Sequence, residues 1–218
     1  FFALADESKK LGIPFAGHIP WSVSTIEASD AGQKCFEHLG AAVSPRIVWD
    51  CSSMKDKLRK EGEDVFDGIS IQAPLTPAQR EALRSFPRKI LETYDAREAD
   101  ALFARLARNN TWLCPTITVL RSMRSLYDEN FTRDPRLKYM RRNIKENWAA
   151  KNNPFICRWT KEYQALEKRV YQKEMEVTGA MRRAGVEILA GSDEPNPFCF
   201  PGFSLHDELG LLVQSGLT

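Results

Sequence analysis

The 218-residue sequence has no long hydrophobic run and no excess of charge of one sign. No stretch approaches the roughly 18 consecutive apolar residues that a membrane-spanning helix needs, and the opening residues lack the pattern of a signal peptide. Lysine and arginine number 31 against 29 aspartates and glutamates, whereas nucleic-acid and membrane-surface binders carry a strong single-sign patch. The sequence therefore predicts neither a nucleic-acid partner nor a membrane partner, and it leaves the compartment open.

Paired cysteine motifs are also lacking. The five cysteines lie far apart with no Cys-x-x-Cys pair, at Cys35, Cys51, Cys114, Cys157 and Cys199. An odd number of scattered cysteines indicates neither a disulfide framework nor a cysteine zinc site, so we expect buried or free thiols. What is present, 43% hydrophobic and 28% charged residues, is the composition of an ordinary globular protein long enough for a sizeable core.

Four short apolar segments are predicted strands, at 13–17, 34–37, 111–119 and 186–190. The first two are joined by a helix that opens with a Ser24-x-x-Glu27 capping box, which makes a compact βαβ unit with parallel strands. Each later strand is also followed by helical sequence, so the fold class is α/β. Four such units make half of a TIM-type (β/α)8 barrel, and the helix-rich stretches at about 40–95 and 120–184 are then insertions.

Capping signals predict where the helices begin and end. The first helix, with an apolar face, ends at Gly12, and later helices begin at Thr76, Asp95, Asp134 and about Cys157 and end near Asn109, Lys151 and Arg183. Residues 44–75 are less regular, and Ser204 caps a last helix that runs to Gly216. Because the chain begins inside a helix without an initiator Met and stops where a helix has just closed, we expect a fragment of a longer protein.

Two of the three histidines and one aspartate directly follow predicted strands. His18, His38 and Asp193 lie at strand ends, where parallel α/β folds place their sites. Imidazole nitrogens and carboxylate oxygens are zinc ligands, and side chains at neighbouring strand ends can converge on one ion. The spacing is less constrained than H-E-x-x-H, so the alternatives are hydrogen-bonded polar histidines and a turn carboxylate.

Six segments of the sequence together carry a resemblance to a known family. They are Gly12-Ile13-Pro14-Phe15-Ala16-Gly17-His18-Ile19-Pro20, Glu27-Ala28-Ser29-Asp30-Ala31-Gly32, Phe36-Glu37-His38-Leu39, Cys114-Pro115-Thr116, Ile188-Leu189-Ala190-Gly191-Ser192-Asp193 and Pro201-Gly202-Phe203-Ser204-Leu205-His206-Asp207-Glu208-Leu209. Together they resemble the metal-dependent amidohydrolases, in particular the imidazolonepropionase-like and prolidase-like branch. The resemblance implies that residues 1–218 are a fragment of a single barrel domain that holds strands five to eight.

The resemblance also implies roles for the residues at the strand ends. His18 and His38 would bind the second of two metal ions, and Asp193 would bind the first and move the proton. The family's His-x-His motif and its bridging lysine would lie upstream of Phe1, so we expect the fragment alone to be inactive. In the intact protein the expected cofactor is one or two divalent ions, with zinc the expected metal. The expected reaction is hydrolysis of a carbon–nitrogen bond in an amide, dipeptide or cyclic amide.

Three further residues are candidates for contact with substrate or with the metal ligands. His206 lies in the first turn of the last predicted helix, where the alternative role is helix packing. Trp21 follows His18 closely and either walls a substrate pocket or packs beneath a loop. Arg121 follows the third predicted strand, where an arginine can bind a substrate carboxylate.

Other functions remain open at this level. The same barrel can act as a lactonase or esterase, because an activated water attacks esters and amides by the same route. A different class is a non-catalytic module whose helices at 134–184 bind a partner or a second copy of the chain. The open edges of a half-barrel favour a homo-oligomer. The expected substrate is a small molecule or peptide, and fold analogy does not identify it.

Overall fold

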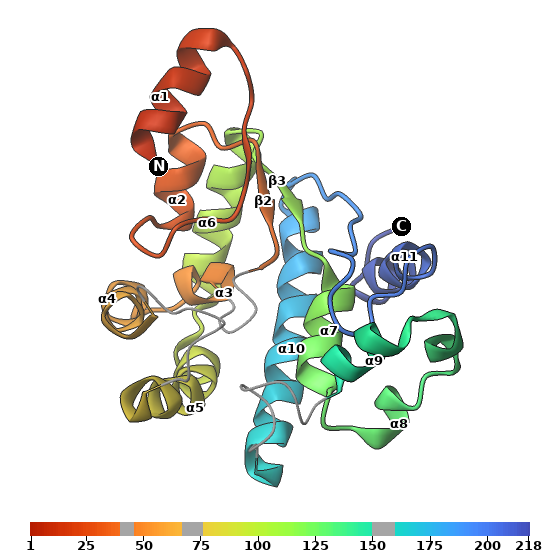
Figure 1. The fold of residues 1–218 in the computed structure, drawn as a ribbon. Coiled ribbons are helices and arrows are strands. Elements are labelled where there is room, and N and C mark those ends of the chain that lie inside the picture. Colours follow the sequence, from red (N-terminus) through yellow and green to blue (C-terminus); the bar gives the residue numbers. More distant parts are fainter. Residues whose placement is uncertain (40–45, 67–75, 150–159) are drawn as a thin grey trace.

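The computed structural model describes residues 1–39, 46–66, 76–149 and 160–218, and the fold is mixed α/β and mostly helical (Figure 1). The strands are β1 (Ala16–Gly17), β2 (Cys35–Glu37) and β3 (Trp112–Cys114). The helices are α1 (Phe2–Leu11), α2 (Thr25–Asp30), α3 (Arg46–Asp50), α4 (Lys55–Phe66), α5 (Pro77–Thr93), α6 (Ala96–Arg108), α7 (Ile117–Ser125), α8 (Glu129–Thr132), the 3-10 helix η1 (Pro135–Tyr139), α9 (Arg142–Trp148), α10 (Lys161–Arg183) and α11 (Ser204–Gln214). Within the described ranges, no helix combines the length and hydropathy needed to cross a membrane.

The strands pair in parallel in the order β1-β2-β3, and the sheet is not closed. The segment that follows α10 adds one parallel bridge, between Leu113 and Ile188. Its backbone bonds run from Leu113 N–H to Glu187 O at 2.9 Å and from Leu189 N–H to Leu113 O at 2.8 Å. The strand predicted at 186–190 is therefore reduced to a single bridge.

The third strand is shorter than predicted. It ends at Cys114, and the β-branched residues from Ile117 onward form α7 instead. The buried carboxylate of Glu208 accepts hydrogen bonds from the backbone N–H groups of Ile117 at 2.9 Å and Thr118 at 2.7 Å. This long-range capping of the first turn satisfies donors that a helix otherwise leaves free, and it outweighs the local preference for a strand.

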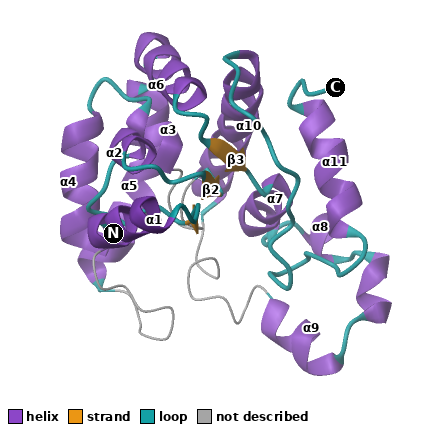
Figure 2. Ribbon diagram, turned by 90° about the horizontal axis from the view of Figure 1, so that it is seen from above, coloured by secondary structure: helices purple, strands orange, loops and turns teal. Residues whose placement is uncertain are grey.

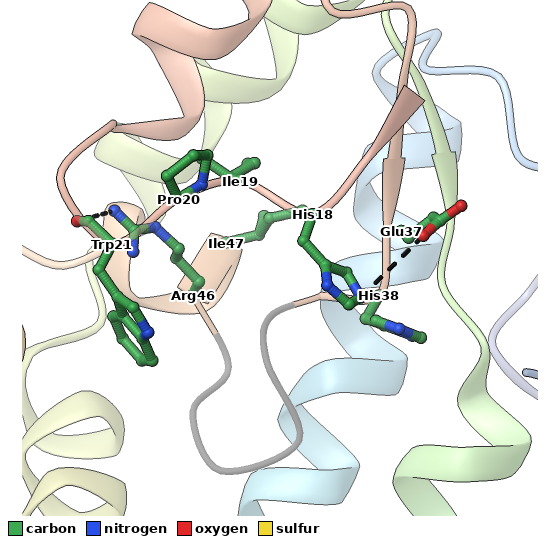
Figure 3. A pocket seen from close by; sticks show the side chains of 8 residues that line it. All are labelled: His18, Ile19, Pro20, Trp21, Glu37, His38, Arg46 and Ile47. Atoms are coloured by element: carbon green, nitrogen blue, oxygen red, sulfur yellow. Dashed lines mark hydrogen bonds and ion pairs between the residues drawn. The ribbon is translucent and has the colours of Figure 1, made fainter. Parts of the chain in front are cut away.

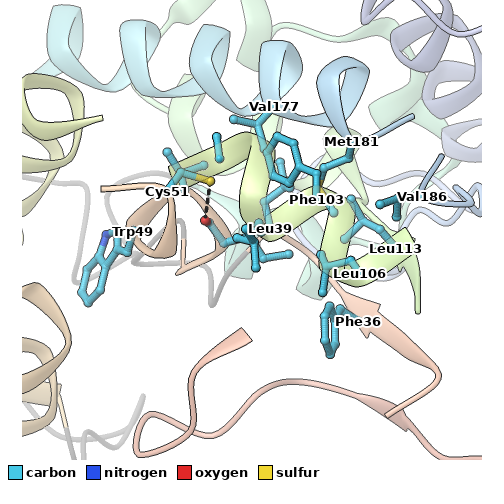
Figure 4. Close-up of a cluster of buried hydrophobic side chains, with 14 of the residues drawn as sticks. Phe36, Leu39, Trp49, Cys51, Phe103, Leu106, Leu113, Val177, Met181 and Val186 are labelled. Atoms are coloured by element: carbon cyan, nitrogen blue, oxygen red, sulfur yellow. Dashed lines mark hydrogen bonds between the residues drawn. The ribbon is translucent and has the colours of Figure 1, made fainter. Parts of the chain in front are cut away.

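The main core lies between one face of the sheet and helices α6 and α10. Phe36 of β2 and its cross-strand partner Leu113 of β3 are fully buried. Val177 and Met181 point from α10 into the same cluster (Figure 4). Seen from above, α6 and α10 lie beside the strands, whereas α11 lies beyond α7 (Figure 2).

The cysteines of the described residues form no disulfide. Cys157 lies outside the described residues, and the other four cysteines are free thiols.

The first helix and the first strand contribute little to this core. On α1, Phe2, Leu4 and Leu11 are 52%, 56% and 61% exposed, and Ile13 after it is 60% exposed. The predicted apolar face of α1 is thus largely exposed. The strand predicted at 13–17 is reduced to Ala16–Gly17, and neither residue is buried. Because β1 is an edge strand that pairs with β2 alone, the core lies beyond the reach of most of these side chains.

Most predicted helix ends are confirmed. Gly12 closes α1 with a left-handed φ of 67°. Capping boxes form at Ser24 and Thr76, and Asp95 caps α6. These signals are local hydrogen bonds within one turn, so the sequence alone determines them.

Other helix predictions need correction. The irregular stretch at 44–75 contains α3 and α4, and the predicted basic helix from Asp134 is a 3-10 turn followed by α9. The helix end predicted near Lys151 and the start predicted near Cys157 lie outside the described residues, and α10 is capped by Thr160. Ser204 is the first residue of α11, so it does not act as the N-cap.

The contact between α10 and α11 predicts opposite effects of alanine at two helical glycines. A Cβ at Gly179 of α10 would overlap the backbone oxygen of Ser215, whereas a Cβ at Gly210 of α11 meets nothing within 4 Å. We expect Gly179→Ala to lower the free energy of unfolding by about 1–3 kcal/mol, because backbone must move. Gly210→Ala should raise it by up to about 1 kcal/mol, because alanine favours helix. Urea unfolding of both variants checks this, and equal effects would contradict the packing described.

Candidate functional site

The parallel strands bring their carboxyl ends to one edge of the sheet. His18 follows β1 directly and His38 follows β2 directly. The centroids of the two imidazole rings are 4.9 Å apart (Figure 3). The backbone N–H of His38 donates to Cys114 O of β3 at 2.8 Å, so the ladder of the sheet fixes the position of this histidine.

His38 is the most firmly held of the candidate residues. Its side chain is 11% exposed, Nδ1 is hydrogen bonded to the hydroxyl of Thr116, and Nε2 lies 3.5 Å from Asp193 Oδ2. Burial lowers the pKa of His38; the charge of Asp193 opposes this shift, and the charge of His18 adds to it. The neutral imidazole is therefore favoured, with one nitrogen engaged by Thr116 and the other directed at Asp193.

Asp193 reaches His38 because the segment before it approaches β3 closely. A Cβ at Gly191 would overlap Cys114 Sγ, so the side-chain-free residue permits this approach. Asp193 Oδ2 accepts a hydrogen bond from Asn196 Nδ2 at 2.7 Å, and Asp193 O accepts one from Asn196 N–H at 3.2 Å. Asp193 thus takes part in a turn as well as facing the histidine, and its side chain is 43% exposed.

Three residues of this cluster have a strained backbone. His38, Thr116 and Asp193 have φ values of 63°, 49° and 50°. The left-handed region is uncommon for residues other than glycine and rare for a β-branched residue such as threonine, and it costs about 1–3 kcal/mol each. Such strain clusters at functional sites, where the surrounding structure holds a side chain in one direction.

A cavity of about 280 Å³ opens beside the two histidines. Its lining residues are His18, Ile19, Pro20, Trp21, Glu37, His38, Arg46 and Ile47 (Figure 3). Trp21 lines the cavity and also packs against Trp49, with ring centroids 5.8 Å apart. The guanidinium of Arg46 lies 5.4 Å from the centroid of the Trp21 ring.

His206 and Arg121 are not among the residues that line this cavity. His206 is exposed in the first turn of α11. Arg121 Nη2 donates to Asp207 Oδ2 at 3.2 Å, and its guanidinium lies 5.9 Å from the Phe131 ring centroid. Because α7 carries Arg121 away from the strand end, this arginine pairs with a carboxylate of α11.

Metal binding was predicted for His18, His38 and Asp193, and the structure brings these side chains to the same edge of the sheet. The donors are arranged as two pairs, His18 with His38 and His38 with Asp193. Across the described ranges, no three His, Cys, Asp or Glu side chains are grouped so that they could hold one ion. The neutral, oriented imidazole of His38 has the form of a ligand, but a stable site needs further donors.

Sequence reasoning assigned no role to three residues of the site. Thr116 holds His38, and its place just after β3 was the available signal. Glu37 Oε2 lies 4.0 Å from His18 Nε2 and lines the cavity. Arg46 reaches the cavity wall from α3, and no spacing in the sequence could have indicated this, because the contact depends on tertiary packing.

Comparison with solved structures finds a bottromycin amidohydrolase that matches this chain with a TM-score of 0.66 and 21% sequence identity. The match covers 99% of this chain and 39% of that chain, so the sequence spans less than half of that protein's length. No protein-family model matches, and no curated protein matches. At this identity the match shows the fold: the chain has the architecture of part of an amidohydrolase, with an open three-stranded sheet in place of the four full strands predicted.

The burial of His38 predicts a pH dependence of stability. Its folded-state pKa lies below the ordinary value of 6.5, so the unfolded chain takes up the proton first. The stability that the neutral ring contributes is present above that value and is lost as pH falls through the folded pKa. Asp193 and Glu37 oppose this effect and His18 adds to it.

We therefore expect the wild-type free energy of unfolding to fall more steeply between pH 7.5 and pH 5 than that of His38→Asn. Asparagine tolerates the left-handed backbone at this position, so the substitution adds no backbone strain to the comparison. Denaturant unfolding at each pH measures the difference, and the exposed His206→Asn serves as the matched control. Identical slopes for wild type and His38→Asn would contradict the burial of a neutral ring.

Proposed function

We propose that the intact protein is a metal-dependent hydrolase that cleaves a carbon–nitrogen bond at the edge where His18, His38 and Asp193 meet. The observation that carries the proposal is the geometry of His38: a buried imidazole whose Nδ1 is held by Thr116 and whose Nε2 faces Asp193 at 3.5 Å. Ligand histidines are commonly oriented in this way through their second nitrogen. The similarity of the fold to part of an amidohydrolase supports the same reaction class.

The residues would act in distinct ways. A divalent ion held at this edge, with zinc the expected metal for these ligand types, would lower the pKa of a bound water and polarise the scissile carbonyl. His18 and His38 would provide nitrogen ligands. Asp193, 43% exposed and therefore open to solvent and substrate, would accept the proton of the attacking water and return it to the leaving nitrogen.

The remaining metal ligands would come from residues outside this chain. A catalytic zinc site uses three protein ligands, whereas no three donors among the described residues are grouped so that they could hold one ion. The chain spans 39% of the solved amidohydrolase. We therefore expect the 218 residues alone to bind metal weakly and not to hydrolyse substrate. The intact protein is expected to carry one or two ions.

Metal content and hydrolysis of the intact protein test the proposal. We expect His18→Ala, His38→Ala and Asp193→Asn to weaken zinc binding by at least about tenfold, because the alanines remove a nitrogen ligand and asparagine removes the negative charge of the carboxylate. Asp193→Asn should also lower kcat, because the amide cannot carry the proton. The measurements are metal analysis after dialysis and rates on paired amide and ester substrates.

His206→Ala is the matched control, because this exposed histidine lies outside the cavity lining and should leave metal content unchanged. Faster cleavage of the ester than of the amide would point to the lactonase or esterase alternative. If wild type and all variants are free of metal and alike, the proposal is wrong and a non-catalytic, partner-binding role takes its place.

A further inference from the structure

The helices that follow α7 pack on a small hydrophobic core of their own. Residues 126–149 contain α8, η1 and α9, and they lie within the helical insertion that the sequence predicts at about 120–184. The buried members of this second core are Leu126, Trp148, Phe198 and Phe200. The last two belong to the segment that joins α10 to α11, which passes beside α9 (Figure 1). The insertion therefore buries its apolar side chains against the segment that carries Asp193.

Phe198 is the side chain that joins the two parts. It is 5% exposed, and its ring centroid lies 5.2 Å from that of Phe131 on α8 and 5.7 Å from that of Trp148 on α9. Phe200 makes an edge contact with Trp148, with ring centroids 5.4 Å apart. Contacts of this kind between aromatic rings stabilise a cluster beyond the area that they bury. The insertion thus holds the Phe198 ring from two of its helices.

The backbone between Asp193 and Phe198 forms a turn that is held along its length. Asn196 N–H donates to Asp193 O at 3.2 Å, and the hydroxyl of Ser122 on α7 donates to Pro197 O. Asp193 and Phe198 both have a left-handed backbone, with φ values of 50° and 57°. This conformation is unfavourable for residues other than glycine, and it persists where surrounding contacts impose it. The burial of the Phe198 ring is such a contact at one end of the turn.

The direction of the Asp193 side chain depends on this turn more than on burial. The side chain is 43% exposed, and its Oδ2 lies 3.5 Å from His38 Nε2. Asn196 Nδ2 donates to Asp193 Oδ2 at 2.7 Å and to Asp193 O at 2.8 Å, so one amide ties the carboxylate to the backbone of the turn. A half-exposed carboxylate held in this way keeps its direction only while the turn keeps its shape.

We propose that the insertion of residues 126–149 positions Asp193 through this turn. Phe131 and Trp148 hold the ring of Phe198, the ring holds the turn, and the turn directs the Asp193 carboxylate at the proposed reaction centre. The three aromatic residues are positioning residues, and none of them lines the cavity. This inference rests on the proposed function, because it names what sets the geometry of the proposed proton acceptor. It gives the insertion a role inside the fold.

Replacing one ring of the insertion at a time tests this role in the intact, metal-free protein. Phe131→Leu and Trp148→Leu remove ring contacts with Phe198 and keep an apolar side chain. The readout is the pair of proton–nitrogen NMR signals of the Asn196 side-chain amide, which donates to Asp193 Oδ2. Asp193→Ala marks where these signals lie without that hydrogen bond. We expect both insertion variants to move the signals towards that position, because the turn loses the contact that imposes its shape.

Tyr139→Leu is the matched control. Tyr139 belongs to the same insertion, but its ring stacks on Phe203, beyond the turn, with centroids 5.6 Å apart. This variant should leave the Asn196 signals at their wild-type positions. The Phe131 ring is half-buried, so Phe131→Leu decides the question if Trp148→Leu fails to fold.

The rate of the metal-loaded intact protein provides a second readout. We expect Phe131→Leu to lower kcat by at least about fivefold and to change KM by less than about threefold, because a misdirected proton acceptor affects the chemical step. In an Asp193→Asn background, Phe131→Leu should lower kcat by less than about a further twofold, since the carboxylate that it positions is already gone. A general loss of folded protein would lower the rate equally in both backgrounds.

Unchanged Asn196 signals in Phe131→Leu and Trp148→Leu would overturn the inference, and so would an equal loss of kcat with and without the Asp193 carboxylate. The outcomes separate it from the proposed function. Movement of the signals in a protein that hydrolyses neither the amide nor the ester supports the positioning role and refutes the hydrolase. Hydrolysis that neither insertion variant alters, with the signals unchanged, refutes the positioning role and leaves the hydrolase standing.

Discussion

The parallel pairing of three very short strands is the constraint on which the site depends. In a parallel sheet every strand ends at the same edge, so residues far apart in sequence meet there. The register pairs Glu37 with Cys114, which places His38 and Thr116 together although 78 residues separate them. The bridge at Ile188 then brings Asp193 to the same edge. A shift of one residue in this register would turn the side chains to opposite faces and disperse the cluster.

Strands of two and three residues do not hold such a register unaided, and buried charges on the helices support it. The Glu208 carboxylate of α11 accepts hydrogen bonds from the backbone N–H groups in the first turn of α7. Near the other end of α7, Arg124 Nε and Nη2 donate to the Glu174 carboxylate of α10 at 2.9 Å and 2.6 Å. Arg124 also bonds to Glu167, so it is shared by two buried carboxylates. Burial raises the pKa of Glu208, while its hydrogen bonds to Thr118 and Ile117 oppose this shift. Both ends of α7 are thereby fixed, and Thr116, the residue before it, is fixed with them.

The sequence revealed those parts of the structure that depend on local chemistry. The capping boxes at Ser24 and Thr76 and the glycine at Gly12 are hydrogen bonds or backbone angles within one turn, and they were predictable for that reason. The placement of His18 and His38 at neighbouring strand ends followed from the βαβ pattern. What the sequence could not reveal depends on distant partners. The conversion of residues 117–119 to helix needs Glu208. The position of Arg46 in the cavity wall needs the packing of α3, through its residue Trp49, against Trp21 and Phe86.

The two histidines of the cluster are held to very different degrees, and this difference bears on how an ion would bind. His38 is 11% exposed and fixed by Thr116, so its ring is already oriented. His18 is 65% exposed, and the carboxylate beside it, Glu37, lies 4.0 Å away at the limit of an ion pair. An ion bound between the two rings would therefore order His38 little further, whereas His18 would lose most of its side-chain conformational entropy. Glu37 lies beside the exposed ring without fixing it. For the metal ion of the proposed function, the affinity of this edge would therefore depend chiefly on how far His18 is ordered before the ion arrives.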